Sequence, residues 1–139
     1  MVTPGESGFD PKTTYIFAEG GGGALRAEVT PTFWQELISG DTRDPAIARI
    51  RNGDGWLVGA FALTGASHWE MHPAGDEILF LVSGAVDVIL EDTGGERVVE
   101  LQPGTACLVP RGVWHRQIVH QPGDLLAITY GRGTQHRAR

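Results

Sequence analysis

The sequence predicts a single all-β domain with one short helix near its N-terminal end, and three observations lead to this prediction. The chain has 139 residues, the size of one domain. Its 20 glycines are about twice the ~7% share usual in proteins, and glycine favours turns over helix interiors. From Ala46 onward, apolar residues recur with a period of about two between glycine and proline turns, as they do in short strands.

Composition excludes several classes of protein. Hydrophobic residues make up 41% of the chain and charged residues 20%, a balance typical of a folded domain rather than a disordered or membrane-spanning one. The net charge of -6 repels a phosphate backbone, so nucleic acid is not expected as a partner. Cys107 is the single cysteine and excludes an intramolecular disulfide. Residues 1–8 lack the apolar run of a signal peptide, and we therefore expect a cytoplasmic protein without a membrane partner.

Residues 1–45 predict an N-terminal extension with edge strands and one helix. The apolar stretch Thr14–Ala18 is typical of an edge strand. Thr30 is a suitable helix cap, Pro31 suits the first helical position, and Gly40 ends the helical pattern. The apolar residues of this helix recur at helical spacing, and they are Phe33, Trp34, Leu37 and Ile38.

Residues 46–130 predict a β-barrel or sandwich, and residues 131–139 a flexible tail without periodicity. The turn Asn52–Gly55 is suited to the corner of a hairpin between the first two of nine strands. The nine predicted strands are Ala46–Arg51, Trp56–Leu63, Ser67–His72, Glu77–Val82, Ala85–Glu91, Arg97–Leu101, Ala106–Val109, His115–His120 and Leu125–Tyr130.

Titratable residues concentrate on one of these predicted strands. Side chains alternate between the two faces of a strand, so His68, Glu70 and His72 share one face. Trp69 and Met71 point to the other face, where packing is the default role for such residues. Three candidate metal ligands therefore lie on one side of the strand.

Two further residues are placed to join this group. The turn Pro73–Gly75 reverses the chain, so Glu77 returns beside His72. His115 is a polar residue at the start of an otherwise apolar strand. Histidine and carboxylate side chains that meet in this way are what a divalent metal ion requires.

At these residues the sequence resembles the cupin superfamily, whose members are small jelly-roll barrels with a metal in the barrel mouth. The second cupin motif, G-x5-P-x-G-x2-H-x3-N, is matched at four positions with the right spacing. These are Gly104, Pro110, Gly112 and His115. Val119 stands where the motif closes with asparagine.

The first cupin motif, G-x5-H-x-H-x3,4-E-x6-G, is matched in its second half. His72, Glu77 and Gly84 have the motif's spacing. Glu70 occupies the position of the first histidine, and Gly65 stands one residue away from the position of the opening glycine. The resemblance implies an all-β cupin jelly-roll barrel, a double-stranded β-helix, preceded here by the segment with the short helix.

The resemblance implies that Glu70, His72, Glu77 and His115 occupy the four metal-ligand positions. Two neutral imidazoles and two carboxylates suit iron, manganese, nickel or zinc as the divalent ion. A second arrangement leaves Glu70 free as a general base while the other three bind the metal. His68 is a third possibility, ligating in place of Glu70 if the strand bulges.

The function expected from this resemblance is that of a metal-dependent enzyme, of dioxygenase or lyase type, acting on a small organic molecule. Glu70 would be its fourth ligand or its catalytic base. One alternative is a non-catalytic cupin that binds or senses a metal or small molecule. Another is a metal-free isomerase or dehydratase, with Glu70 and His115 as the proton-transfer pair. Small cupins commonly dimerise, so we also expect a homodimer.

Several other polar and apolar residues are expected to have ordinary structural roles. His120 and His136 are expected in solvent, and Cys107 as a small buried hydrophobe. Arg49 and Arg51 would share a strand face, where a solvated role is commoner than binding of a substrate carboxylate. Four apolar residues are expected to line the barrel interior, and they are Phe61, Leu79, Leu81 and Ile128.

Overall fold

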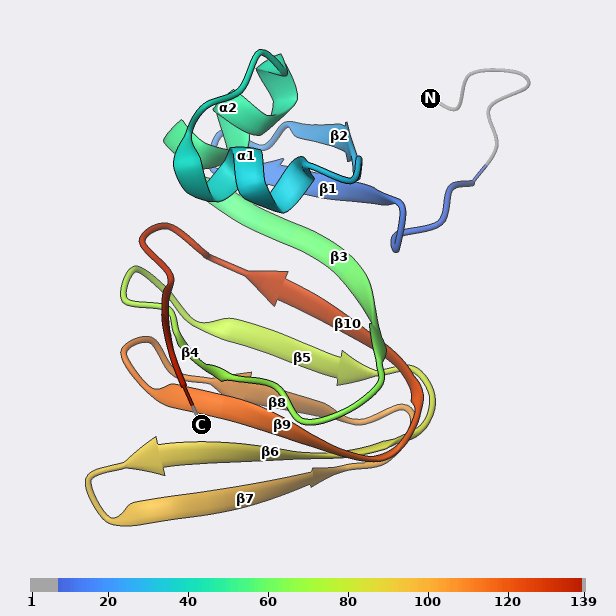
Figure 1. The fold of residues 1–139 in the computed structure, drawn as a ribbon, viewed down its shortest axis with the longest axis vertical. Coiled ribbons are helices and arrows are strands. Elements are labelled where there is room, and N and C mark those ends of the chain that lie inside the picture. Colours follow the sequence, from blue (N-terminus) through green and yellow to red (C-terminus); the bar gives the residue numbers. More distant parts are fainter. Residues whose placement is uncertain (1–7, 139) are drawn as a thin grey trace.

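The computed structural model describes residues 8–138, which form two antiparallel sheets and two short helices (Figure 1). One sheet has six strands in the order β2-β1-β3-β10-β5-β8, and the other has five in the order β11-β4-β9-β6-β7. The predicted all-β class is confirmed. The strands are β1 (Thr14–Glu19), β2 (Ala24–Glu28), β3 (Gly55–Leu63), β4 (Trp69–Met71), β5 (Glu77–Leu81), β6 (Ala85–Asp92), β7 (Gly95–Leu101), β8 (Ala106–Val109), β9 (Trp114–Gln121), β10 (Gly123–Thr129) and β11 (Gln135–Arg137). The helices are α1 (Phe33–Ser39) and α2 (Pro45–Asn52).

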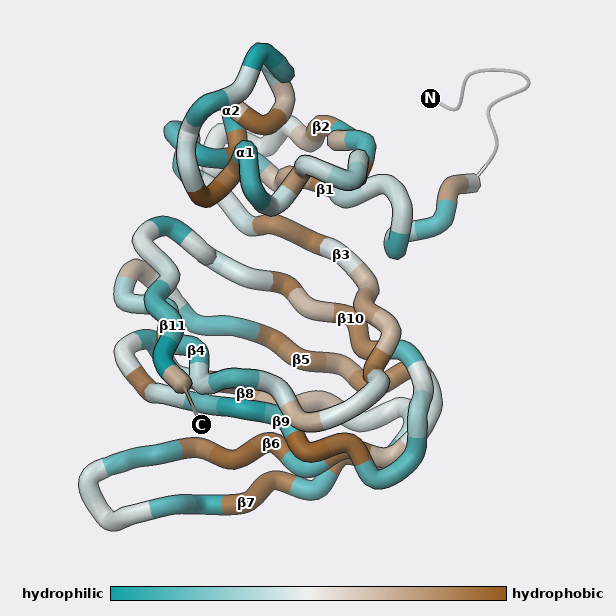
Figure 2. Tube along the Cα trace, in the orientation of Figure 1, coloured by the Kyte–Doolittle hydropathy of each residue, from teal (hydrophilic) through white to brown (hydrophobic). Residues whose placement is uncertain are grey.

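The main core lies between the two sheets, and strand periodicity explains its composition. Buried residues recur at every second position along β5 and along the central parts of β6 and β10, which gives the strands one apolar face, and Figure 2 shows the hydrophobic stretches along them. Leu79 and Leu81 are buried as predicted, and so is Cys107. Ile128 does not line the interior, because Leu125 and Ala127 occupy the inward positions of β10. The buried residues of this core are Leu63, Leu79, Leu81, Val86, Val88, Leu90, Leu101, Cys107, Val109, Leu125 and Ala127.

A second, smaller core holds the two helices against the N-terminal strands. Tyr15 of β1, Phe33 of α1 and Ile47 of α2 are buried together with Ala27. The rings of Tyr15 and Phe33 meet edge to face with their centroids 5.2 Å apart. Strand β1 lies between β2 and β3 rather than at a sheet edge, contrary to the prediction. Both helices thereby sit above β3, at one end of the molecule (Figure 1).

Helix α2 occupies a segment for which the sequence analysis predicted a strand and a hairpin. Asp44 caps the helix, since its carboxylate accepts a hydrogen bond of 2.9 Å from the Ala46 amide, and Pro45 takes the first helical position. Ile47 and Ile50 then fall on one helix face, which packs on the second core. Apolar residues and arginines alternate in this segment, and the strand was predicted from that period of two, whereas the helical period of about 3.6 applies.

Helix α1 lies in the predicted region and begins two residues later than its predicted cap implies. Thr32, not Thr30, is the residue before its first turn. Gly40 ends the helix as predicted, with a φ of 79° that glycine adopts more readily than other residues. The guanidinium of Arg51 donates hydrogen bonds to the last carbonyls of α1, at Leu37 and Ile38.

The predicted flexible tail contains strand β11, so that prediction is wrong for Gln135–Arg137. This strand pairs antiparallel with β4. The guanidinium of Arg137 lies 4.8 Å from the ring centre of Trp69 and 4.6 Å from that of Trp114, and it forms an ion pair with Glu91. These partners are distant in sequence, and the tail's composition therefore gave no sign of them.

Residues 1–7 and 139 lie outside the described part of the chain. Parts of the predicted extension and tail fall there. Neither helix among residues 8–138 has the length and apolar character needed to cross a membrane.

Candidate metal centre

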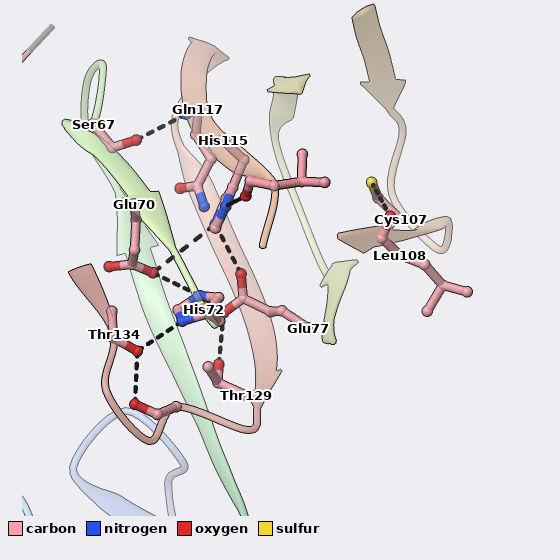
Figure 3. Close-up of polar contacts among 12 residues, drawn as sticks. Ser67, Glu70, His72, Glu77, Cys107, Leu108, His115, Gln117, Thr129 and Thr134 are labelled. Carbon is pink, nitrogen blue, oxygen red and sulfur yellow. Dashed lines mark hydrogen bonds and ion pairs between the residues drawn. The ribbon is translucent and has the colours of Figure 1, made fainter. Parts of the chain in front are cut away.

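Four side chains from three strands and one turn meet inside the barrel (Figure 3). Glu70 lies on β4, and His72 directly follows that strand. Glu77 opens β5, and His115 is the second residue of β9. Glu70 and His115 are register partners in the β4–β9 pair, which places their side chains next to each other. The structure thus brings together all four residues that the sequence analysis singled out as ligands.

The donor atoms of these four residues are close enough to share one ion. His72 Nε2 lies 3.0 Å from Glu70 Oε1 and 3.3 Å from Glu77 Oε2. His115 Nε2 lies 3.0 Å from Glu77 Oε1 and 3.9 Å from Glu70 Oε1. One donor atom from each residue can be chosen so that all four lie within 4.8 Å of one another. Ligand atoms about 2.1 Å from a common ion stand about 3.0 to 3.4 Å apart, so this spacing fits a metal ion.

The hydrogen bonds around the cluster support the same conclusion. His72 Nε2 and Glu77 Oε1 are buried and have no hydrogen-bond partner, although charged groups lie near both. The contacts are short but lack hydrogen-bond geometry, so the atoms are aimed at a shared centre rather than at one another. An unsatisfied buried polar atom is costly, and a cation between these groups would satisfy both.

Thr134 fixes the proton on His72. Its hydroxyl donates to the carbonyl of Gly131 at 2.7 Å, so the same oxygen is left to accept from His72 Nδ1 at 2.8 Å. When the ring is neutral, as metal binding requires, Nδ1 carries its proton and the lone pair of Nε2 faces the cluster. This tautomer is the one in which His72 can bind a metal through Nε2.

The other three ligand candidates also have supporting contacts. His115 Nδ1 faces the carbonyl of Val113 at 3.4 Å, which can only accept a hydrogen bond. Thr129 donates to Glu77 Oε2 at 2.6 Å, and His136 Nε2 lies 3.0 Å from Glu70 Oε2. These supports come from β10, β11 and the loop before β9. The donor set is therefore positioned by residues outside it, as in metal sites generally.

Glu70 is more exposed to solvent than the other three candidate ligands. His72, Glu77 and His115 are 2 to 4% exposed, whereas the Glu70 side chain is 35% exposed. Glu70 is therefore the member of the group that solvent or a substrate reaches most easily.

Without a bound ion, His72 holds a proton tightly and Glu77 stays ionised. Burial by itself would lower the pKa of His72, but the contacts with Glu70 and Glu77 outweigh it and raise the pKa to about 9. Burial would raise the pKa of Glu77, and the contacts with His115 and His72 outweigh it and lower the pKa to about 2. A proton thus occupies the place between these groups that a metal ion would take, so metal and proton compete for the site.

A cavity of about 1050 Å³ opens from this cluster. Its lining includes all four candidate ligands, the inner faces of β3 and β10, and residues of both helices. This volume is large enough for a small organic molecule beside the ligands.

Other residues considered in the sequence analysis lie outside the donor group. His68 is exposed on the cavity lining and is not among the converging donors. His120 is exposed as predicted and contacts Asp87. His136 is also exposed, but it contacts Glu70, which the sequence analysis did not foresee.

The two arginines predicted on one strand face have separate roles on α2. The Arg49 guanidinium binds Glu19 at 2.6 Å, and that of Arg51 binds the end of α1. Their strand placement was wrong because the segment is helical. Arg51 does line the cavity.

The supporting residues Thr129 and Thr134 were missed by the sequence analysis. Each is a lone threonine more than 50 residues from the side chain it contacts. The one available signal was for Thr129, since the alternation along β10 places it on the same face as the inward Leu125 and Ala127.

Comparison with known proteins agrees with this fold. The family model of the cupin domain (Cupin_2) matches residues 60–130, which is just over half of the chain. The chain belongs to the cupin family. The match begins within β3 of this cupin and leaves out both helices and β11. No curated protein matches the chain.

Solved structures similar to this cupin include proteins with and without a stated activity. A cupin-2 domain containing protein from Shewanella frigidimarina has 20% identity over 53% of this chain and 69% of its own, with a TM-score of 0.48. Oxalate decarboxylase from Bacillus subtilis has 16% identity over 60% of this chain and 24% of its own, with a TM-score of 0.54. Hydroquinone 1,2-dioxygenase from Sphingomonas sp. TTNP3 has 20% identity over 60% of this chain and 69% of its own, with a TM-score of 0.47. Identities of this size show the fold, and the reaction has to be argued from the site.

Proposed function

We propose that this cupin binds a divalent transition-metal ion through Glu70, His72, Glu77 and His115 and is a metal-dependent enzyme acting on a small organic molecule. The observation that carries the proposal is the convergence of four donor atoms, two of them buried without a hydrogen-bond partner, at the wall of a cavity of about 1050 Å³. A purely structural polar cluster would have its buried atoms paired.

The donor set suits iron, manganese, nickel or zinc. Two imidazole nitrogens and two carboxylate oxygens combine borderline and hard ligands, and two carboxylates balance the charge of a divalent ion. A bound ion of this kind supplies Lewis-acid polarisation of a substrate oxygen at neutral pH. The chain contributes the fixed positions and tautomers of the ligands.

Glu70 has the position of a residue that works on the substrate as well as on the metal. Its carboxylate borders the cavity, is one-third exposed, and has Oε1 toward His72 and Oε2 toward His136. Contact with His72 overcomes the effect of burial and keeps the pKa of Glu70 below its ordinary value, so the group is ionised near neutral pH. It can serve as fourth ligand, or accept a proton from a substrate held in the cavity.

Dioxygenase and lyase chemistry both remain within the proposal. Each needs an ion with an exchangeable position facing a substrate pocket, and the exposed side of the cluster provides the route to it. A cupin that binds a ligand without turnover, and a metal-free acid-base enzyme, are the two outcomes that would replace this proposal.

The first test is the metal content of tag-free protein by elemental analysis. We expect about one divalent transition-metal ion per chain. The His72→Ala variant should lose it, because His72 is buried and presents its Nε2 lone pair to the cluster. The matched control is His68→Ala, since His68 lies on the cavity lining but outside the donor group.

Three results would contradict parts of the proposal. Metal-free protein as purified, which also fails to take up iron, manganese, nickel or zinc on titration, would exclude the metal site. Equal loss in His68→Ala and His72→Ala would show that the wrong ligands were chosen. Turnover that survives complete removal of the metal by a chelator would favour acid-base chemistry.

A further inference from the structure

The cavity has two ends of different character, and the end far from the ligand cluster is apolar. It is lined by Trp34 and Ile38 of α1, Ile50 of α2, and Leu57 and Phe61 of β3. The rings of Trp34 and Phe61 have their centroids 6.1 Å apart. The helix residues lie outside residues 60–130, so this wall is an addition of this chain to the matched domain.

Two of these wall residues are unusually exposed. Ile38 is 66% exposed and Trp34 is 41% exposed, although both are large and hydrophobic. Figure 2 shows α1 and α2 above a hydrophobic stretch of β3. Apolar surface that lines a cavity and is open to water is stabilised by covering it with an apolar ligand.

Four charged residues belong to the lining, and Arg51 of α2 is the one at the helix end, beside α1. The four are Glu70, Glu77, Arg51 and Arg132. The negative charges of the two carboxylates balance the charge of a divalent ion. The two guanidinium groups then give the cavity a net positive charge. Arg51 is engaged with the carbonyls of α1. Arg132 is exposed and has no hydrogen bond or ion pair with any residue from 8 to 138.

Arg132 belongs to the turn that contacts the ligand cluster. It follows Gly131, whose carbonyl accepts from Thr134, and Thr134 in turn holds His72. The free guanidinium is therefore on the turn that supports the metal site. A guanidinium in this setting is suited to a carboxylate, which it binds through two parallel hydrogen bonds.

From these observations we propose that the cavity binds an amphipathic carboxylic acid. Its carboxylate is held by Arg132 near the ligand cluster, and its apolar body lies against Trp34, Ile38 and Phe61. Residues of the N-terminal helices thereby determine which substrates this cupin accepts. This inference rests on the proposed function, because the bound ion is what leaves the cavity with net positive charge.

Calorimetric titration of zinc-loaded protein tests the inference without relying on turnover. The zinc content is measured first, so that a failure to bind metal is recognised separately from a failure to bind the acid. Butanoate, hexanoate and octanoate are the probes, with octanamide and octylammonium as neutral and cationic controls. We expect the dissociation constant to fall about fourfold per added methylene until the apolar end is filled. Octanoate should bind about tenfold or more tightly than octanamide.

Two variants with matched controls locate the two ends of the ligand. Arg132→Gln should weaken octanoate binding about tenfold and leave octanamide unchanged. Its control is Arg97→Gln, an exposed arginine of β7 outside the lining. Ile38→Gln should weaken octanoate more than butanoate, and its control is Val98→Gln, since Val98 is 53% exposed and also outside the lining. Both test positions are on the surface, and unchanged zinc content and circular dichroism confirm that the variants are folded.

Four results would overturn the inference in zinc-loaded protein. They are equal affinity for octanoate and octanamide, no dependence on chain length, wild-type affinity in Ile38→Gln, and an octanoate preference that survives Arg132→Gln. The last result would assign the carboxylate to another group, such as the ion itself. Octanoate binding by protein that takes up no zinc would contradict the proposed metal function and the part of this inference that assigns the positive charge of the cavity to a bound ion.

Discussion

Thr134 illustrates how a single residue outside the ligand set controls the site. Its hydroxyl has one proton, and that proton goes to the Gly131 carbonyl. The bond to His72 must then be donated by the histidine, which leaves Nε2 with its lone pair toward the cluster. One threonine thus selects both the tautomer and the orientation of a buried ligand.

We therefore expect Thr134→Val to weaken zinc binding about 10- to 100-fold, the usual effect of removing a partner of a ligating histidine. Thr134→Ser should retain the affinity of the unaltered protein, because the hydroxyl is kept. Competition with a chromophoric chelator measures both. Equal affinities in the Val and Ser variants would show that the hydrogen bond to His72 does not matter for metal binding.

At this scale the sequence predicted the candidate donors well and their supports poorly. Glu70, His72, Glu77 and His115 were recognisable because their spacings within two short motifs are local. The contact of Thr134 with His72 spans 62 positions and depends on how the end of the chain returns to β4. The sequence of the tail has no periodicity from which its pairing with β4 could be predicted.

Among the elements, β1 and β3 to β10 were predicted with small errors at their ends, β2 and β11 were not predicted as strands, and α2 was assigned to the wrong class. Alternation decides the face of a strand, so turns rich in glycine and proline sufficed to place β3 to β10. In α2 the same alternation of isoleucine and arginine also fits a helix, and the deciding signal is the cap at Asp44 followed by Pro45. In so short a segment, a cap residue indicates a helix more reliably than the spacing of the apolar residues does.

The Asp44 cap should be measurable as stability. We expect Asp44→Ala to lower the free energy of unfolding by about 1 kcal/mol, because the Ala46 amide loses its acceptor. Asp44→Ser should recover most of the loss. Urea denaturation gives these values, with Asp41→Ala as control, since Asp41 is exposed and precedes the helix without capping it. A loss in Asp41→Ala as large as in Asp44→Ala would argue against the cap.

On the scale of the whole molecule, the N-terminal segment is the feature that sequence analysis interpreted least well. It was expected to contain edge strands and one helix. The structure instead packs α1 and α2 over β3 of the same chain, where they close one end of the cavity. The sequence does not indicate this placement, because a helix that covers a barrel and one that covers a partner have the same amphipathic pattern.

The homodimer nevertheless stays a prediction. The outer face of β5 and β8 exposes Phe80 and Leu108, with Val82 directly after β5. A cluster of exposed apolar side chains on one sheet face is typical of an interface. We expect a dimer in solution scattering at micromolar concentration, which Leu108→Glu should dissociate. A monomer in the unaltered protein would contradict the prediction.

The contact between His136 and Glu70 has a practical consequence for anyone who prepares this protein. Strand β11 brings the last part of the chain to the candidate metal centre, with an imidazole already within hydrogen-bond distance of a ligand position. A polyhistidine tag fused after Arg139 would begin four residues beyond His136 and would carry many competing imidazoles to the same place. Metal content and metal affinity measured on such a fusion would include metal bound by the tag. Purification should therefore rely on a cleavable tag placed before residue 1.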